Sequence, residues 1–211
     1  MIWTNSKYVG DGDVFLATER NYKYIDLNLL KKVSEIVFVS DENKYIYDNY
    51  YDKIKDLKLI GVTGTNGKTT TCYLIYQMLN LMGEKASYIG TIGFYIDDMV
   101  FKLNNTTPEI SLLYNMLYYA KKRICRVVVM EVSSHALKQD RIYGLLFDSV
   151  LVTNITRDHL DYHKTLKDYI KSKQKLIHLT RGKKICILNK KDKYYKKFKI
   201  KDNNNLIIGK D

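Results

Sequence analysis

The sequence predicts an α/β protein with a small N-terminal α/β unit and a central domain. In the central domain, a mostly parallel sheet is flanked by helices. Short apolar runs alternate with longer helical patterns along the chain, and this order favours parallel strands joined by helical crossovers. A glycine-rich loop at 64–67 separates one such run from the next helical pattern, as at a phosphate-binding turn. With 211 residues and 45% apolar content, the chain can form one sizeable domain with a small appendage.

The expected elements follow the chain in order. In the first unit, the apolar runs 13–17 and 36–39 predict strands on either side of a helix at 27–33. The polar range 40–55 is expected to be the linker to the central domain. From residue 56 on, we expect strands at 57–63, 86–91, 126–131, 148–153, 184–188 and 205–208, and helices at 68–82, 109–122 and 164–178. Ligands of such sheets bind at the carboxyl ends of the strands, where the motifs below lie.

Composition excludes several classes of protein. No stretch approaches the roughly 20 apolar residues of a membrane span, and we expect no signal peptide, because the first residues lack a basic region followed by a long apolar run. Cys72, Cys125 and Cys186 are far apart in apolar segments, which indicates buried thiols in a cytoplasmic protein. The net charge of +12 comes from lysines concentrated in the last third among Tyr, Asn and Ile. We interpret them as a solvated surface and expect no nucleic-acid partner.

The loop after the first central strand predicts nucleoside triphosphate binding. Its glycines let backbone N–H groups face an anion, and the following helix adds partial positive charge. Lys68 can reach the terminal phosphates, and the Thr69 hydroxyl can hold Mg²⁺. The strict P-loop pattern needs a glycine where Val62 stands, so the loop indicates a subgroup of P-loop proteins. The predicted nucleotide-binding residues are Gly64, Thr65, Asn66, Gly67, Lys68, Thr69 and Thr70.

Two later strands end in further candidate site residues. Glu131 closes the apolar run 127–130, where a carboxylate needs a partner or a metal ion, although a surface acid is the simpler alternative. The range 154–163 follows the next strand and contains two histidines and two aspartates within six residues. This density favours a site, with His159 as the metal candidate and His163 in a structural role.

One lysine of the helix at 164–178 is expected to be buried. At about 100° per residue, Lys173 shares a stripe with the apolar Leu166, Ile170 and Ile177, whereas Lys171 and Lys175 face the other way. Burial lowers a lysine pKa and leaves a neutral amine that can take up carbon dioxide as a carbamate, a metal ligand. The alternative is a lysine that extends its amine to solvent.

Two segments combine structural and binding features. In the range 105–109, Thr107 as N-cap and Pro108 at the first helical position would start a helix, and the hydroxyls could equally hold an anionic group. In the range 133–141, Ser133, Gln139 and Arg141 could line a pocket at the strand end or be ordinary surface residues.

Together these motifs resemble the Mur ligase family. The ranges 63–70, 105–108, 131–135, 153–163 and 169–173 are similar, in this order, to its motifs, and the MurE type is the subgroup that they resemble. Val62 also fits the family's loop. The range 5–17 resembles the opening of the family's uridine-binding domain, which is unusually short here.

The resemblance implies an ATP-dependent ligase that adds the third amino acid to UDP-MurNAc-L-Ala-D-Glu in peptidoglycan synthesis, acting as a monomer. Thr69 and Glu131 would hold one Mg²⁺, and Glu131, His159 and carbamylated Lys173 a second. Lys68, His159 and Lys173 would be the catalytic residues. In the full-length enzyme, a Lys173→Ala variant would lose most turnover, with partial rescue by a short carboxylic acid. The substrate-binding residues would be Ser6, Asn105, Thr106, Thr107, Ser133, Gln139 and Arg141.

The family pattern also implies a domain organisation. Residues 1–55 would be the UDP-binding domain and residues 56–211 an incomplete ATP-binding domain, with the amino-acid-binding domain absent. We therefore expect that the chain alone cannot complete ligation. Two alternatives remain open: a folylpolyglutamate synthase-like ligase, and a nucleotide- or UDP-sugar-binding module without catalysis. Which amino acid is added, diaminopimelate or lysine, cannot be read from these motifs.

Overall fold

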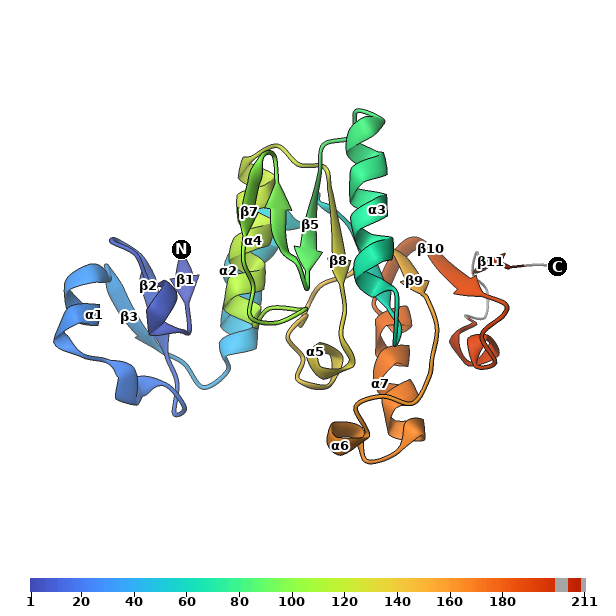
Figure 1. The fold of residues 1–211 in the computed structure, drawn as a ribbon. Helices are drawn as coiled ribbons and strands as arrows, with labels where there is room; N and C mark the ends of the chain where they lie inside the picture. Colours follow the sequence, from blue (N-terminus) through green and yellow to red (C-terminus); the bar gives the residue numbers. More distant parts are fainter. Residues whose placement is uncertain (200–204, 210–211) are drawn as a thin grey trace.

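The central part of the chain forms the predicted helix-flanked sheet, seen in a computed structural model that describes residues 1–199 and 205–209 (Figure 1). Each strand expected after residue 56 is present, although the strand expected at 184–188 begins earlier, at Thr180. The strands are β4 (Lys58–Thr63), β5 (Ala86–Gly90), β8 (Val127–Glu131), β9 (Phe147–Val152), β10 (Thr180–Asn189) and β11 (Asn205–Ile208). The predicted long helices are α3 (Lys68–Leu81), α4 (Ile110–Lys122) and α7 (Leu166–His178).

The order of the strands brings the predicted motifs together. The eight-stranded sheet has the order β11-β10-β9-β4-β8-β5-β6-β7, and the six strands from β11 to β5 run parallel. Strand β4 therefore lies between β8 and β9, and the carboxyl ends of these three strands meet at one edge. All five residues of β8 are buried, as expected for a parallel strand covered on both faces.

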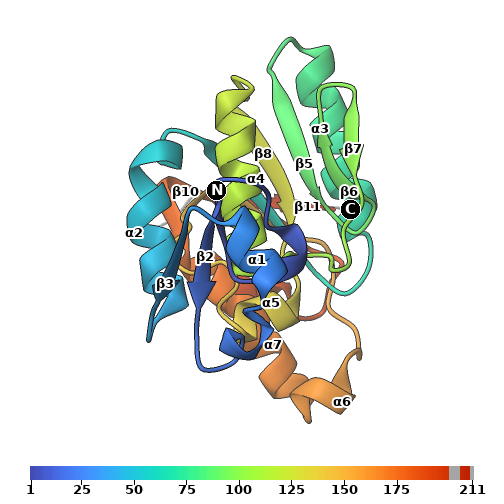
Figure 2. The same cartoon turned by 90° about the vertical axis from the view of Figure 1, so that its left-hand side faces the viewer.

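Helices cover the two faces of this sheet in separate layers. Figure 2 shows α4 on one side and α3 on the other. Helix α3 packs over Val62, Tyr88 and Val129. Helices α4 and α7 contribute to the larger core on the other face, which includes Met130 and Val150.

The N-terminal unit is a second, small sheet of three parallel strands in the order β1-β2-β3. The two strands and the helix predicted here are confirmed as β2 (Val14–Ala17), α1 (Leu27–Lys32) and β3 (Glu35–Phe38). Sequence reasoning missed β1 (Ile2–Trp3), which is only two residues long, and the 3-10 turns η1 (Ser6–Tyr8) and η2 (Tyr22–Tyr24).

The polar range 40–55 is more than a linker, because most of it forms helix α2 (Glu42–Ile54). Its buried Ile46, Tyr50 and Ile54 join the main core, where α2 packs on α4. The Tyr50 hydroxyl accepts a hydrogen bond from the Ile2 backbone N–H at 3.1 Å, which fixes strand β1 to this helix. The domain boundary at residue 55 stays a prediction, but the connection itself is part of the packed structure.

Other elements that were not predicted are short. Strands β6 (Gly93–Ile96) and β7 (Met99–Phe101) form an antiparallel hairpin at the end of the sheet, with Asp97 at a φ of 50° in the turn. Helices α5 (Ser134–Lys138) and α6 (Leu160–His163) and the 3-10 helix η3 (Tyr195–Phe198) complete the fold. All three cysteines are buried and unpaired, as predicted. None of the helices in the described residues is long and apolar enough to span a bilayer.

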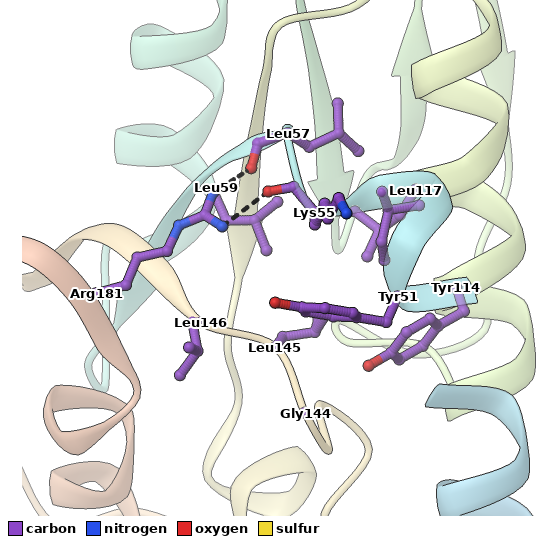
Figure 3. Close-up of a pocket in the computed structure, with 11 residues that line it drawn as sticks. Tyr51, Lys55, Leu57, Leu59, Tyr114, Leu117, Gly144, Leu145, Leu146 and Arg181 are labelled. Atoms are coloured by element: carbon purple, nitrogen blue, oxygen red, sulfur yellow. Dashed lines mark hydrogen bonds between the residues drawn. The ribbon is translucent and has the colours of Figure 1, made fainter. Parts of the chain in front are cut away.

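A small cavity of about 100 Å³ lies where β4 and β9 begin, at the other end of these strands from the glycine loop. Figure 3 shows the Arg181 guanidinium directed at the backbone carbonyls of Lys55 and Leu57, to which it donates at 2.8 and 2.6 Å. Arg181 also pairs with Asp148 at 3.0 Å. The walls are mainly aliphatic and aromatic, and no predicted site residue lines this cavity, so it is a structural feature at the back of the sheet.

Candidate nucleotide-binding site

The glycine loop between β4 and α3 has the backbone geometry of an anion cradle. Gly67 is the N-cap of α3 with a φ of 80°, and a side chain there would meet nothing within 4 Å. Gly64 has a φ of 147°, and a Cβ atom there would lie 1.9 Å from Thr153 Oγ1. Gly67 thus permits the turn into the helix, whereas Gly64 permits close contact with the segment after β9.

The segment after β9 holds the glycine loop through polar contacts. The Asn154 amide accepts from the Asn66 backbone N–H at 3.0 Å and donates to the Asn66 carbonyl at 2.9 Å. The Thr65 N–H donates to the Asn154 carbonyl at 2.8 Å, and the Thr153 hydroxyl donates to the Asn66 carbonyl at 2.7 Å. Neither residue has a role predicted from the sequence. The signal was their position directly after a strand that neighbours β4.

Lys68 folds back over the loop. Its Nζ atom donates to the carbonyls of Gly64 at 3.0 Å and Thr65 at 2.8 Å. Burial lowers the pKa of this amine, and the negative charge of Glu131 partly offsets that effect. In the structure this amine is thus bonded to backbone oxygens of the loop, and its contact with phosphate stays a prediction.

Glu131 is fully buried at the end of β8, so the surface alternative is wrong. Its Oε2 atom accepts from the Thr69 hydroxyl at 3.0 Å, which joins the two residues predicted to share a metal ion. The carboxylate also accepts from the Tyr88 hydroxyl and from Thr91. Each oxygen of this buried carboxylate therefore has hydrogen-bond donors, as a buried polar group requires.

Lys173 lies directly behind the loop, as its helical stripe predicts. Only 1% of its surface is exposed, and its Nζ atom donates to the Gly64 carbonyl at 2.8 Å. The amine also lies 4.7 Å from the centre of the Tyr169 ring. Burial, together with the positive charge of Lys68, lowers the pKa of Lys173 to about 7. A large fraction of this amine is therefore neutral at physiological pH.

The predicted histidine pair separates into one exposed and one buried side chain. His159, with a φ of 51°, keeps 46% of its side chain exposed. His163 is fully buried, and its Nε2 atom has no hydrogen-bond partner among the described residues. His135, for which the sequence predicts no role, lies with its ring centre 4.8 Å from that of His159. Burial lowers the pKa of both His135 and His163.

A cavity of about 270 Å³ opens beside the loop, and its lining includes the three predicted catalytic residues and four of the seven predicted substrate-binding residues. It is lined by Lys68, Asn105, Thr106, Ser133, Ser134, His135, Arg141, His159 and Lys173. Ser134 and His135 were missed, although they belong to a motif that follows the Glu131 strand. Nucleotide-loop and substrate candidates therefore share one space, as a reaction between two bound molecules requires.

Three predicted substrate residues do not line this cavity. Thr107 is buried, and its hydroxyl donates to the Glu131 carbonyl at 2.8 Å and accepts from the Ser133 N–H at 3.0 Å. Gln139 is exposed and accepts from Arg141 Nε at 2.8 Å, which orients that guanidinium. Ser6 lies in turn η1 of the N-terminal unit. Their roles in substrate binding stay predictions.

The helix start predicted at Thr107 and Pro108 is wrong. Helix α4 begins at Ile110 with Glu109 as N-cap, and the Glu109 side chain makes no capping hydrogen bond. The Thr107 hydroxyl is already committed to strand β8, so it is unable to cap the helix.

The donor set fits magnesium at one position. Thr69 and Glu131 present oxygen atoms 3.0 Å apart beside the phosphate loop, and Mg²⁺ prefers oxygen ligands. Within residues 1–199 and 205–209, no group of three or more His, Cys, Asp or Glu side chains could hold a metal ion. A second metal position would therefore depend on the Lys173 carbamate as well as on Glu131 and His159.

Comparison with known proteins gives a consistent result. The family model of the Mur ligase middle domain matches residues 62–208. The UDP-N-acetylmuramoyl-L-alanyl-D-glutamate–2,6-diaminopimelate ligase 1 of Clostridium acetobutylicum is 43% identical over 166 residues, which are 76% of this chain and 33% of that protein. The chain thus spans about a third of the length of this curated relative.

Solved structures share the fold. A UDP-N-acetylmuramoyl-L-alanyl-D-glutamate–2,6-diaminopimelate ligase aligns with a TM-score of 0.74 at 24% identity, over 98% of this chain and 47% of that one. E. coli FolC, in complex with DHPP and ADP, aligns with a TM-score of 0.55 at 17% identity, over 81% of this chain and 47% of that one.

Proposed function

The chain belongs to the Mur ligase family through its middle domain, and from this premise we propose that it binds ATP with Mg²⁺ beside UDP-MurNAc-L-Ala-D-Glu. The reaction would join this dipeptide to an amino acid in peptidoglycan synthesis. The relative in Clostridium acetobutylicum is named for 2,6-diaminopimelate, and we propose the same amino acid here. A reaction that consumes ATP favours a cytoplasmic location.

One observation carries the proposal. The phosphate loop, the Thr69–Glu131 pair and the buried Lys173 converge at the ends of three adjacent strands, next to the cavity that holds the substrate candidates. A nucleotide-binding protein without ligase chemistry has no need for a neutral lysine behind its phosphate loop.

The residues of the chain would act mainly by positioning and charge. Lys68 would exchange the Gly64 and Thr65 carbonyls for the terminal phosphate oxygens of ATP. Arg141, which donates to the Thr107 carbonyl at 2.8 Å, would direct its remaining N–H groups to a substrate carboxylate in the cavity. Thr69 and Glu131 would hold Mg²⁺, which supplies positive charge to the phosphates when it is bound.

The chemistry would proceed in two steps. An oxygen of the dipeptide's terminal carboxylate attacks the γ-phosphorus of ATP, the bond to ADP breaks, and an acyl phosphate forms. The amine of the incoming amino acid then attacks the acyl carbon, loses a proton and releases phosphate. Both steps need exclusion of water and charge stabilisation more than covalent help from the protein.

Lys173 would contribute as a carbamate. Its neutral amine adds to carbon dioxide and gives up a proton, which places a carboxylate on a long side chain. The lowered pKa, the burial and the proximity to Gly64 support this modification. With Glu131 and His159, the carbamate would hold a second Mg²⁺.

Calorimetric titration of the chain tests the proposal. We expect saturable binding of UDP-MurNAc-L-Ala-D-Glu, and of ATP when Mg²⁺ is present, with no binding of a folate substrate. Lys68→Ala should weaken ATP binding strongly, whereas Lys58→Ala, which removes the same charge from an exposed position on β4, should not. Binding of the folate substrate alone would support the folylpolyglutamate synthase-like alternative.

A second outcome separates a ligase from a binding module. In a ligase, Lys173→Ala should abolish the slow hydrolysis of ATP that the UDP substrate induces, while binding of both ligands persists. If a full-length version of the protein binds both ligands and never cleaves ATP, the non-catalytic module is favoured.

A further inference from the structure

The two oxygens of the buried Glu131 carboxylate accept hydrogen bonds from different kinds of donor. Oε1 accepts from the Tyr88 hydroxyl at 2.5 Å and from the Thr91 backbone N–H at 2.8 Å. Among the described residues, Oε2 accepts only from hydroxyls, those of Thr69 at 3.0 Å and Thr91 at 3.2 Å. A hydroxyl can rotate and accept or bind a metal ion in turn, whereas the amide N–H is fixed.

Tyr88 reaches this carboxylate from the neighbouring strand. In the register of β5 and β8, Tyr88 lies opposite Val129, two residues before Glu131, so both side chains lie on the α3 face of the sheet. Tyr88 is completely buried.

The phenol ring is fixed by three other tyrosines. The ring centres of Tyr73 and Tyr95 lie 5.8 and 5.6 Å from that of Tyr88 in edge-to-face arrangements, and that of Tyr76 lies 6.3 Å away. Tyr73 and Tyr76 belong to α3, the helix that begins with Lys68 and Thr69. The ring cluster therefore ties the hydroxyl to the helix that carries the phosphate loop.

The adjacent glycine leaves the space that this contact needs. A Cβ atom at Gly90 would lie 2.2 Å from Glu131 Oε1 and 2.3 Å from the Tyr88 hydroxyl oxygen. A larger residue at position 90 would displace both atoms. The backbone at position 90 and the phenol at position 88 thus form one socket for Oε1.

We propose that Tyr88 is a positioning residue that holds Glu131 Oε1, so that Oε2 faces Thr69 and is the oxygen offered to Mg²⁺. This rests on the proposed function, in which Glu131 holds the metal ion of ATP. Groups that orient a metal ligand from behind typically change metal affinity about 10- to 100-fold when they are removed. The phenol is such a group for this carboxylate.

Removal of the hydroxyl with the ring retained tests the proposal. Binding of a fluorescent ATP analogue to the full chain is measured over a series of Mg²⁺ concentrations. We expect Tyr88→Phe to raise the Mg²⁺ concentration for half-maximal binding at least about 10-fold, with metal-free binding unchanged. Tyr95→Phe is the matched control, because its ring belongs to the same cluster and its hydroxyl makes no contact with Glu131 among the described residues.

Two further variants complete the test. Gly90→Ala keeps the phenol but places a methyl group where Glu131 Oε1 and the Tyr88 hydroxyl lie. It should therefore raise the Mg²⁺ concentration for half-maximal binding, as Tyr88→Phe does. It also provides the test if Tyr88→Phe does not fold. Glu131→Gln tests whether Glu131 holds the metal ion, independently of the role of Tyr88. If Glu131→Gln raises the Mg²⁺ requirement and Tyr88→Phe stays within twofold of the unmodified chain, the positioning role is refuted and the proposed function stands. If Glu131→Gln also has no effect, Glu131 does not hold the metal ion, and Tyr88 has no metal ligand to position.

Discussion

The buried amine of Lys173 should make the stability of the folded chain depend on pH in a way that one substitution removes. Burial lowers the pKa of Lys173 from 10.5 to about 7. Each pKa unit corresponds to about 1.4 kcal/mol, so protonating this amine costs roughly 5 kcal/mol more in the folded than in the unfolded chain. The neighbouring Lys68 ammonium adds to the effect of burial.

The sign follows from the protons bound by each state. Between pH 7 and 10.5 the unfolded chain carries a proton on Lys173 that the folded chain lacks, so the free energy of unfolding rises with pH. Below pH 7 the destabilisation is complete, and above 10.5 it is gone. From pH 7 to 9 the gain should be about 2 to 3 kcal/mol from this residue alone.

The assay is urea denaturation at several pH values in carbon dioxide-free buffer, with Lys173→Met as the variant. Methionine keeps the length of the side chain and removes the titration. The unmodified chain should gain about 2 to 3 kcal/mol relative to Lys173→Met between pH 7 and 9. Lys171→Met, on the exposed face of the same helix, should run parallel to the unmodified chain. A constant difference between the unmodified chain and Lys173→Met would refute the burial argument.

Added bicarbonate tests the carbamate separately. At pH 8 the neutral amine should react, and ¹³C-labelled bicarbonate should give a carbamate signal in the NMR spectrum that Lys173→Met lacks. A pH-dependent difference without this signal would uphold the lowered pKa and rule out the modification under these conditions.

Three other substitutions have definite expected outcomes. Gly64→Ala should abolish ATP binding in calorimetry and lower stability, because its Cβ would lie 1.9 Å from Thr153 Oγ1; binding of normal affinity would contradict the described contact. Arg181→Ala should lower the free energy of unfolding by about 2 to 4 kcal/mol, since two carbonyls and Asp148 lose their partner, yet leave ATP affinity unchanged. Burial lowers the pKa of His163, so its contribution to stability is lost as pH falls below the ordinary value of 6.5. His163→Phe should reduce this acid sensitivity in denaturation curves, and an unchanged pH profile would count against the buried neutral ring.

Local patterns were sufficient to predict the large elements and the centre of the site. The apolar run before Glu131 and the stripe containing Lys173 both indicate burial, because hydrophobic periodicity reports which face of an element is covered. Helix α2 was not predicted in this way. Its sequence is dominated by polar residues and tyrosines, and only its packing on α4 shows which face is apolar.

The contacts that support the site were not predictable in the same way. Tyr88 and Asn154 act on residues 43 and 88 positions away in the chain. Nothing in the sequence around Tyr88 marks it as a site residue, and the position of Asn154 after a strand does not identify its partner. The failed capping assignment at Thr107 has the same origin, because its hydroxyl serves a strand 24 residues further on. Such contacts depend on strand order, which the alternation of strands and helices does not specify.

Strand order also explains why the site forms where it does. From β4 the chain crosses to β5 and returns to β8 on one side, and only then continues to β9 on the other side of β4. The loops that leave β8 and β9 therefore diverge at the end of β4, and they leave a crevice above the phosphate loop. Glu131 contacts Thr69 after the loop from one side, Asn154 contacts Asn66 in the loop from the other, and Lys173 contacts Gly64. A change in the position of either neighbouring strand would separate the carboxylate, the loop and the lysine, so the topology is itself a condition of the proposed chemistry.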